Sequence, residues 1–309
     1  MKIAFLGTPE FANDSLKACL ECGEVVSVIT QPDRRRGRGK KLLPTQVKKE
    51  ALKHNLEVYQ PKNIKSEEAI NYLKALNLDV MVVVAYGQIL SKEVLDIPKY
   101  GCINVHASLL PKLRGAAPIN WAIVRGYEVS GVTTMQMDVG LDTGNMLDKI
   151  KVGIDREMTA GQLHDILKVE GAKLLKKTLE DIKNNSLTPE KQDDKLSTYA
   201  PMIDKEMARI NWDKSAEEVH NLVRGFNPWP VAYTTFNSEK IKVYETKVIN
   251  QKSNHVPGSI ISVKDDGLLV QTGEKAILIT SIQMPSKKRM SVKSFLNGHT
   301  VEAGTILGG

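Results

Sequence analysis

Short apolar runs alternate with stretches of helical spacing over the first 183 residues. The run "DVMVVVAY" over residues 79–86 is apolar enough to be a strand buried on both faces of a sheet. We expect strands at 2–6, 25–29, 79–86, 101–106, 131–137 and 146–154, and helices at 11–22, 45–54, 66–76, 117–125 and 159–182. Strands that alternate with helices in this way predict an α/β fold with a doubly wound, mostly parallel sheet.

The pattern changes after residue 183. Residues 184–204 are polar and interrupted by proline, which predicts a linker. A helix at 216–226 follows, and then strands at 232–236, 240–249, 258–263, 268–271 and 276–283. Closely spaced strands joined by turns such as Asp266-Gly267 predict a small β-barrel. The expected organisation is a first domain over 1–183, a linker over 184–204 and a second domain over 205–309.

Composition indicates an ordinary globular protein with an excess of basic charge. Of the 309 residues, 41% are hydrophobic and 26% are charged, and 43 Lys and Arg against 36 Asp and Glu give a net charge of +7. No apolar run approaches the roughly 20 residues needed to cross a bilayer. The run after Met1-Lys2 is also too short for the core of a signal peptide. We therefore expect a cytoplasmic protein without a membrane partner, and the position of its basic residues matters more than their total.

Cysteine is scarce, as in proteins of a reducing compartment. Cys19 and Cys22 have the spacing of half a zinc site or of a redox pair, but no second CxxC and no matching pair of histidines follows. We interpret these two residues as small buried thiols on an early helix. The sequence therefore predicts no metal site.

The segment "INVHASLLPKLRG" ends a predicted strand in two polar residues. Asn104 and His106 are separated by one residue, so their side chains point to the same face of the strand. An amide donates a hydrogen bond without a change of charge, and an imidazole can accept or donate a proton near neutral pH. Ligands of doubly wound sheets bind at the carboxyl ends of the strands. The pair therefore predicts a site for an oxyanion and a proton, the alternative being two polar residues that only end a strand.

Asp142 is a third candidate, in the stretch "MDVGLDTGNM". Gly140 and Gly144 permit a tight backbone around its carboxylate. Asp-Thr-Gly is also the motif of aspartic proteases, whose chemistry needs a second carboxylate to share a proton. No second copy of the motif occurs, so a protease would require two chains to pair through this loop.

Two glycine-containing stretches lack the full pattern of nucleotide-binding motifs. Gly7-Thr8-Pro9 follows the first strand without the later glycines of a dinucleotide-binding loop. The stretch "GRGK" over residues 37–40 has neither the spacing of a P-loop nor a Ser or Thr after the lysine. The sequence therefore offers little support for a nicotinamide-dependent enzyme or for a P-loop nucleotide-binding protein.

Basic residues gather in "DRRRGRGKKLLP", over residues 33–44. The cluster is either a solvated loop or a surface matched by phosphate. It leaves the predicted sheet at the same edge as Asn104 and His106, so we favour contact with RNA that orders the loop on binding. The expected RNA-contacting residues are Arg34, Arg35, Arg36, Arg38, Lys40 and Lys41.

Together these stretches resemble the family of methionyl-tRNA formyltransferases, folate-dependent enzymes that formylate initiator methionyl-tRNA. The resemblance runs nearly end to end, through "FLGTPEFA", "TQPDRRRGRGKKLLPTQVK", "NVHASLLPKLRGAAPINWAI", "MDVGLDTGNML", "TYAPMIDKEMARINW" and "VRGFNPWPVAY". The central block and the Asp142 loop are shared with other formyltetrahydrofolate-using enzymes, whereas the arginine-rich loop is more specific to the tRNA enzymes. Leu113 stands where the family often has an aromatic residue and Asn145 where Asp is common, and both are expected to flank the site.

The resemblance implies a Rossmann-like formyltransferase domain followed by an OB-like β-barrel that binds tRNA. It implies that Asn104, His106 and Asp142 are catalytic, that 10-formyltetrahydrofolate is the co-substrate, and that a monomer uses initiator methionyl-tRNA in translation initiation. It places the folate beside Ser108, Leu109, Leu110 and Pro111, with the backbone of the loops that hold Tyr86, Gln88 and Val139 lining the pteridine.

Two alternative functions would explain part of these sequence features. Another formyltransferase, or a formyltetrahydrofolate hydrolase, would account for the first domain alone. A non-catalytic RNA-binding protein would account for the barrel and the basic loop, but it has no use for Asn104, His106 and Asp142 together. Incubation with formyl-folate and methionyl-tRNA, against an amino-sugar or ribonucleotide acceptor, distinguishes the three.

Overall fold

The structure is a computed structural model that describes residues 1–36, 41–251 and 253–308. The chain forms two compact units. Unit 1 comprises residues 1–118, 130–153 and 164–200, and unit 2 comprises residues 119–129, 154–163 and 201–309. The chain therefore passes between the units more than once.

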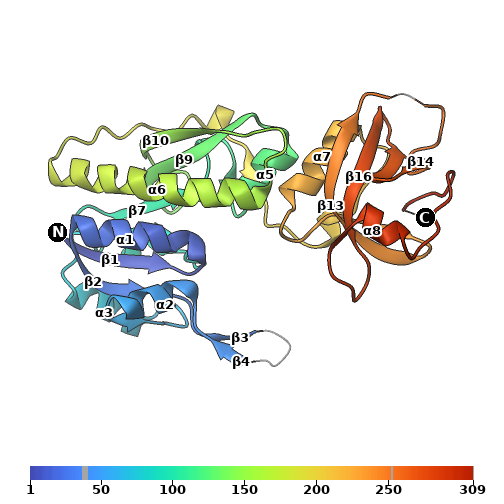
Figure 1. Cartoon of the computed structure of the whole chain (residues 1–309). Coiled ribbons are helices and arrows are strands. Elements are labelled where there is room, and N and C mark those ends of the chain that lie inside the picture. The colour runs from blue at the N-terminus through green and yellow to red at the C-terminus, as the bar shows by residue number, and fades with distance from the viewer. Residues whose placement is uncertain (37–40, 252, 309) are drawn as a thin grey trace. The chain divides into compact units, whose positions relative to one another are not determined.

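Unit 1 is built on a seven-stranded sheet with the strand order β10-β9-β7-β6-β1-β2-β5 (Figure 1). Its strands are β1 (Lys2–Gly7), β2 (Glu24–Ile29), β5 (Val58–Tyr59), β6 (Val80–Val84), β7 (Cys102–His106), β9 (Val129–Gln136) and β10 (Met146–Gly153). The pairs β1–β2, β1–β6, β6–β7 and β2–β5 are parallel, and β7–β9 is antiparallel. All five residues of β6 are buried, as expected for a central strand. The predicted mostly parallel sheet is confirmed.

Helices alternate with these strands along the chain, and all except α4 lie where the sequence predicts a helix. They are α1 (Asn13–Cys22), α2 (Gln46–Lys53), α3 (Glu67–Ala75), α4 (Lys92–Leu95), α5 (Pro118–Val124) and α6 (Ala160–Lys183). Thr45 and Ser66 cap α2 and α3, because their hydroxyls accept hydrogen bonds from backbone amides of the first turn. The helix predicted over 11–22 begins instead with a 3-10 turn, η1 (Glu10–Ala12), after Pro9.

The helix α6 packs on the face of β7 that is opposite to His106. A Cβ atom at Gly171 of α6 would lie 3.1 Å from Val105, so the glycine permits this close approach. Val105 and His106 are neighbours on a strand, and their side chains point to opposite faces. The face of β7 that bears Asn104 and His106 is therefore not the face that α6 covers.

Two short pairs of strands were not predicted. β3 (Arg34–Arg36) and β4 (Lys41–Leu43) form an antiparallel pair that extends from unit 1 (Figure 1). β8 (Arg114–Gly115) runs parallel to β11 (Tyr199–Ala200), which follows a 3-10 turn, η2 (Asp194–Leu196). Strands of two or three residues are too short to show a period-2 pattern, so no hydrophobic pattern predicts them.

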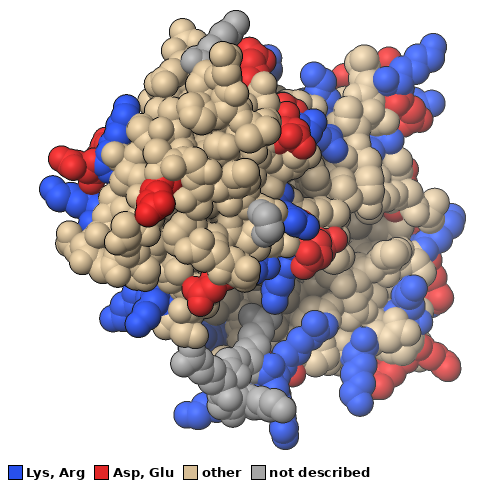
Figure 2. Space-filling model, turned by 90° about the vertical axis from the view of Figure 1, so that its right-hand side faces the viewer, with Lys and Arg blue, Asp and Glu red and all other residues tan. Residues whose placement is uncertain are grey.

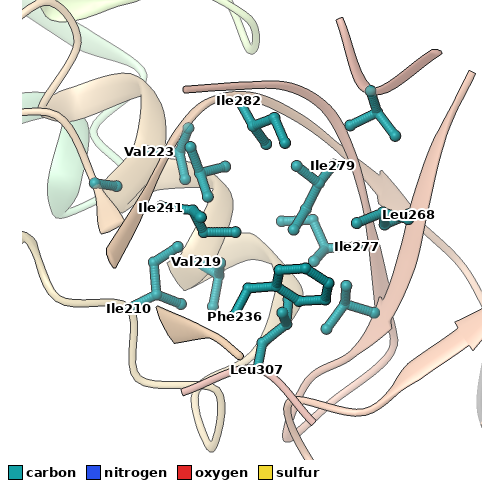
Figure 3. Close-up of a cluster of buried hydrophobic side chains, with 14 of the residues drawn as sticks. Ile210, Val219, Val223, Phe236, Ile241, Leu268, Ile277, Ile279, Ile282 and Leu307 are labelled. Carbon is teal, nitrogen blue, oxygen red and sulfur yellow. The ribbon is translucent and has the colours of Figure 1, made fainter. Parts of the chain in front are cut away.

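Unit 2 contains α7 (Ala216–Gly225) and an antiparallel sheet. The sheet has the order β12 (Tyr233–Phe236), β13 (Glu239–Ile249), β16 (Ala276–Gln283), β15 (Gly267–Gln271) and β14 (Ile260–Lys264), and β17 (Met290–Ser291) pairs with β16. Two short helices, η3 (Glu206–Ala208) and α8 (Val292–Leu296), complete it. Figure 3 shows side chains of α7 and of the strands converging in one apolar core, among them Val219, Ile241 and Ile279. An antiparallel β domain therefore follows the parallel one, as predicted.

Charge is mixed over the surface. Figure 2 shows Lys and Arg side chains interspersed with Asp and Glu on the visible face. Several lysines form ion pairs, for example Lys176 with Glu21 at 2.6 Å. None of the helices in the described parts of the chain is long and apolar enough to cross a membrane.

Candidate active site

His106 is the last residue of β7, and its imidazole is held by two different groups. The side chain is buried, with 6% of its surface exposed. Its Nε2 lies 3.0 Å from the carbonyl oxygen of Leu113, and its Nδ1 lies 3.7 Å from Oδ2 of Asp142. Because a carbonyl oxygen can only accept, the Leu113 contact is a hydrogen bond when Nε2 carries a proton. The nitrogen that faces the carboxylate is therefore Nδ1.

Asp142 lies in the connection between β9 and β10. Its backbone adopts a φ of 54°, in the left-handed region that Asp enters more readily than most residues. Its Oδ2 accepts a hydrogen bond of 2.8 Å from the backbone N–H of Gly115. A Cβ atom at Gly144 would lie 1.8 Å from the Gln136 carbonyl oxygen, which explains the glycine at that position. The loop thus brings the carboxylate to within 3.7 Å of the His106 imidazole at the end of β7.

Asn104 occupies the middle of the same strand. Its backbone pairs with Val83 of β6 and Met135 of β9, and its side chain is partly buried. In the part of the chain that the structure describes, no group forms a hydrogen bond with this side-chain amide. The amide is therefore available to a ligand on the face of β7 that also bears His106.

The predicted folate-contacting residues after β7 form a compact turn. The Ser108 hydroxyl donates to the Lys112 carbonyl oxygen at 2.6 Å, and Leu110 is buried against Met135 and Met146. The peptide bond between Leu110 and Pro111 is cis, and Leu109 is partly exposed. The side chains of Ser108 and Leu110 therefore stabilise the turn, and this segment presents mainly its backbone to a ligand.

The three other predicted folate-contacting residues differ in exposure. The Tyr86 ring is buried in the core of unit 1, where burial raises the pKa of its phenol, and its hydroxyl has no partner among the described residues. The Gln88 side chain accepts a hydrogen bond from the Ile64 amide at 2.8 Å. Val139 is 71% exposed, on the loop that holds Asp142. Only Val139 of the three presents an apolar side chain to solvent.

Unit 1 contains a cavity of about 880 Å³ near the amino end of β7. Gly101, Ile103 and Gln136 are among the residues that line it, and so is Val139. Asn104, His106 and Asp142 are not among the residues that line it in the described chain. We therefore locate the chemistry by the His106–Asp142 pair rather than by the size of this cavity.

A smaller cavity, of about 210 Å³, lies where β1, β2 and β6 end. Residues that follow each of these strands line it, namely Thr8, Gln31 and Ala85. Tyr86 and Arg34 line it as well. One residue predicted to contact folate, Tyr86, and one predicted to contact RNA, Arg34, therefore line the same cavity. This cavity lies at the sheet edge where ligands of such folds bind.

The described part of the basic cluster forms two antiparallel strands, β3 and β4, where the sequence predicts a loop. Arg34 pairs with Leu43 and Arg36 with Lys41 across β3 and β4, while Arg38 and Lys40 lie outside the described residues. Among the described residues no carboxylate forms an ion pair with Arg34, Arg35 or Lys41. Arg35 and Lys41 are exposed, and Arg34 contacts Gln31 at 3.4 Å. The hairpin thus displays basic side chains that protein carboxylates do not neutralise.

Sequence reasoning missed three groups of the site. The Leu113 carbonyl contacts His106, although Leu113 was expected only to flank the site. The Gly115 amide contacts Asp142, and the Gln192 side chain donates to two carbonyl oxygens of the Asp142 loop. Two of these groups belong to the backbone, whose contacts cannot be predicted from the type of residue. The third lies in the segment that was predicted to be a linker.

Comparison with known proteins shows the family of this chain. A model described as "Formyl transferase" matches residues 1–179, and one described as "Formyl transferase, C-terminal domain" matches residues 202–300. The methionyl-tRNA formyltransferase of Clostridium perfringens strain 13 is 55% identical over 308 residues, 99% of this chain and 100% of that protein. The chain belongs to the methionyl-tRNA formyltransferase family. The family member of Clostridioides difficile strain 630 is 52% identical over the full length of both chains.

Solved structures share the fold of this family member at lower identity. An N-formyltransferase from Helicobacter canadensis, in complex with folinic acid and dTDP-3-aminofucose, has a TM-score of 0.67 at 22% identity, covering 92% of this chain and 99% of that chain. HypX from Aquifex aeolicus, in complex with tetrahydrofolic acid, has a TM-score of 0.62 at 15% identity, covering 99% of this chain and 50% of that chain. At these identities the likeness concerns the fold.

Proposed function

We propose that this chain transfers the formyl group of 10-formyltetrahydrofolate to the α-amino group of initiator methionyl-tRNA, as a cytoplasmic monomer that serves translation initiation. The observation that supports the reaction is the pair formed by His106 and Asp142, whose Nδ1 and Oδ2 atoms are 3.7 Å apart at the carboxyl end of β7. The full-length likeness to methionyl-tRNA formyltransferases supports the acceptor.

No covalent enzyme nucleophile is required. An α-amino group has an ordinary pKa of about 7.7–8, and the neighbouring ester lowers it, so the amine is largely neutral at pH 7. The amine nitrogen forms a bond with the formyl carbon, and an electron pair moves onto the formyl oxygen. The bond from that carbon to N10 of the folate then breaks. The amine loses a proton and N10 gains one, so protons and electrons balance.

Asn104 and protonated His106 stabilise the oxygen on which negative charge develops. The free amide of Asn104 donates one hydrogen bond and Nδ1–H of His106 donates a second. Because the Leu113 carbonyl accepts from Nε2–H, the ring cannot turn Nε2 toward the substrate without losing a buried hydrogen bond, so Nδ1 is the nitrogen that donates. The loss of one such donor costs about 2.7–4 kcal/mol in transition-state stabilisation.

The Asp142 carboxylate balances the charge of the imidazolium and relays a proton. It accepts from the Gly115 amide through Oδ2, so its orientation is fixed. A water molecule between the carboxylate and the reacting nitrogens completes the path from the amine to N10. Proton transfer by a positioned group contributes typically about 10²–10⁴-fold to a rate.

Exposed apolar side chains fit the co-substrate. Val139 and Leu141, on the loop that holds Asp142, are 71% and 56% exposed, and Ile89, after β6, is 76% exposed. A flat pteridine would cover such side chains, which are costly to leave in water. We propose Tyr86, Gln88 and Ser108 to Pro111 as backbone contacts of the same ligand.

Arg34, Arg35 and Lys41 form no ion pair with a carboxylate among the described residues, and such side chains fit the phosphates of tRNA. Phosphate contacts by Lys and Arg release counterions and give nucleic-acid binding its dependence on salt. We therefore assign Arg34, Arg35 and Lys41, together with Arg36, Arg38 and Lys40, to tRNA binding.

The test is formylation of a defined acceptor. The chain is incubated with 10-formyltetrahydrofolate and either methionyl-tRNA, a dTDP-linked amino sugar or buffer, and the products are separated by mass. We expect formylmethionyl-tRNA and no formyl sugar. Free formate in every arm would indicate a hydrolase, and binding of tRNA without any product would indicate a non-catalytic RNA-binding protein.

A further inference from the structure

Gln192 is a buried side chain whose hydrogen bonds all serve the candidate site. Its Nε2 donates to the carbonyl oxygens of Asp142 at 2.8 Å and of Gly144 at 2.7 Å. Its Oε1 accepts from Nε of Arg114 at 3.0 Å. Only 5% of the residue is exposed, so water does not replace these partners. Both donor hydrogens of one amide are thus used to hold the backbone on either side of Thr143.

The loop needs such an anchor. Asp142 has a left-handed backbone, and the residues Val139 and Leu141 of the same loop are exposed. The loop's other internal bonds come from Asp138, which accepts from Gly140 and Thr143. Those bonds shape the tip of the loop, but they do not tie it to the rest of unit 1. Gln192 ties the backbone of the loop to residues 192–200, whereas the Gly115 N–H holds only the Asp142 side chain.

The segment that contains Gln192 also forms hydrogen bonds with residues 113–115, which contact His106 and Asp142. Thr198 accepts from the Arg114 amide through its carbonyl at 2.9 Å and from the Leu113 amide through its hydroxyl at 2.9 Å. Arg114 forms an ion pair with Asp194 at 2.8 Å. Residues 113–115 supply the carbonyl that contacts His106 and the amide that contacts Asp142. One segment, residues 192–200, therefore positions both partners of the His106–Asp142 pair.

We propose that Gln192 is a positioning residue for formyl transfer, which acts through the carboxylate of Asp142. The proposal rests on the proposed function, since it assumes that Asp142 takes part in the reaction. Glutamine is specifically suited to the position. Glutamate has the same shape but no donor, and it would bring negative charge against two carbonyl oxygens.

The experiment compares Gln192→Glu with a matched control in unit 2, Gln271→Glu. Gln271 is also 5% exposed, and its Nε2 also donates to two backbone carbonyl oxygens, those of Thr272 and Lys275. Single-turnover formyl transfer, the KM for methionyl-tRNA and the thermal midpoint are measured for both variants. We expect Gln192→Glu to slow transfer roughly 10- to 100-fold with little change in KM, because small misplacements of reacting groups have such effects. We expect Gln271→Glu to lower only the thermal midpoint.

A double variant separates positioning from a general loss of structure. If Gln192 acts through Asp142, adding Gln192→Glu to Asp142→Asn causes no further loss of rate, whereas independent effects multiply. Full activity of Gln192→Glu, or multiplied losses in the double variant, overturns the proposal. If Gln192→Glu does not fold, Gln192→Met, which removes the donors without adding charge, decides by the same criteria. Inactivity of the unaltered chain toward methionyl-tRNA would instead contradict the proposed function.

Discussion

The carbonyl oxygen of Leu113 lies 3.0 Å from Nε2 of His106, and Leu113 reaches that position with a φ of 60°. A leucine in the left-handed region is uncommon and costs about 1–2 kcal/mol. Leu113 is 2% exposed, so its buried side chain offsets part of this cost. The orientation of the imidazole therefore depends on a strained backbone seven residues away in the sequence.

We expect Leu113→Val to reduce both stability and turnover. A β-branched side chain is disfavoured at positive φ, and the substitution also removes a buried methylene, for a total loss of about 2 kcal/mol in the free energy of unfolding. Leu167→Val is the control, because Leu167 is fully buried in the helix α6 and loses only the methylene. Urea denaturation and single-turnover transfer are compared. Equal effects of the two substitutions on the rate would show that the Leu113 backbone does not position His106.

Replacement of His106 by alanine should slow formyl transfer by roughly 10²–10³-fold, because a donor to the oxyanion is lost. Affinity for methionyl-tRNA, measured by filter binding at fixed salt, should stay the same. His54→Ala serves as the control, since His54 is an exposed histidine that follows the last residue of α2. A near-normal single-turnover rate for His106→Ala would remove the imidazole from the mechanism.

The double variant Arg34→Ala with Arg35→Ala should weaken the use of methionyl-tRNA and flatten its dependence on salt. Each lost phosphate contact lowers the slope of log K against log salt by about 1. Lys74→Ala with Lys92→Ala changes the net charge equally, and both of these lysines are paired with carboxylates. The KM for methionyl-tRNA is measured between low and physiological salt. An unchanged slope for the arginine variant would mean that the hairpin does not touch the RNA.

The base of the hairpin depends on the charge of Asp33. Hydrogen bonds from Lys48 and Gln60 hold the pKa of this carboxyl below its ordinary value. A lowered pKa in the folded state stabilises the protein at pH values above the unfolded pKa of about 4, and the effect is lost as the pH falls through the folded value. Because the pair is partly exposed, we expect Asp33→Asn to cost at most about 1 kcal/mol at pH 7. The difference in urea stability between the two proteins should shrink below pH 4, and a constant difference would contradict this origin.

Local hydrophobic patterns in the sequence predict much of the fold, but they do not predict most contacts of the candidate site. The apolar run of β6 and the end of β7 at Asn104 and His106 were predictable, because burial and period-2 alternation leave a strong signal. The strands β3 and β4 have three residues each, too few for a period-2 pattern, so the sequence predicts only a loop there. Gln192 lies 50 residues from Asp142 in the sequence, and only the folded chain brings them together. The Leu113 contact depends on a backbone angle, which side-chain types do not specify.

The small cavity shared by Tyr86 and Arg34 affects how the kinetics of this chain should be measured. Residues proposed to contact different substrates line the same cavity, so we expect a substitution of Thr8 or Gln31, which also line it, to alter the apparent KM of both substrates. If one substrate is varied at a single fixed concentration of the other, a change in the apparent KM of both substrates would be read as a change for one of them alone. A full two-substrate matrix is the appropriate design for every variant near this cavity.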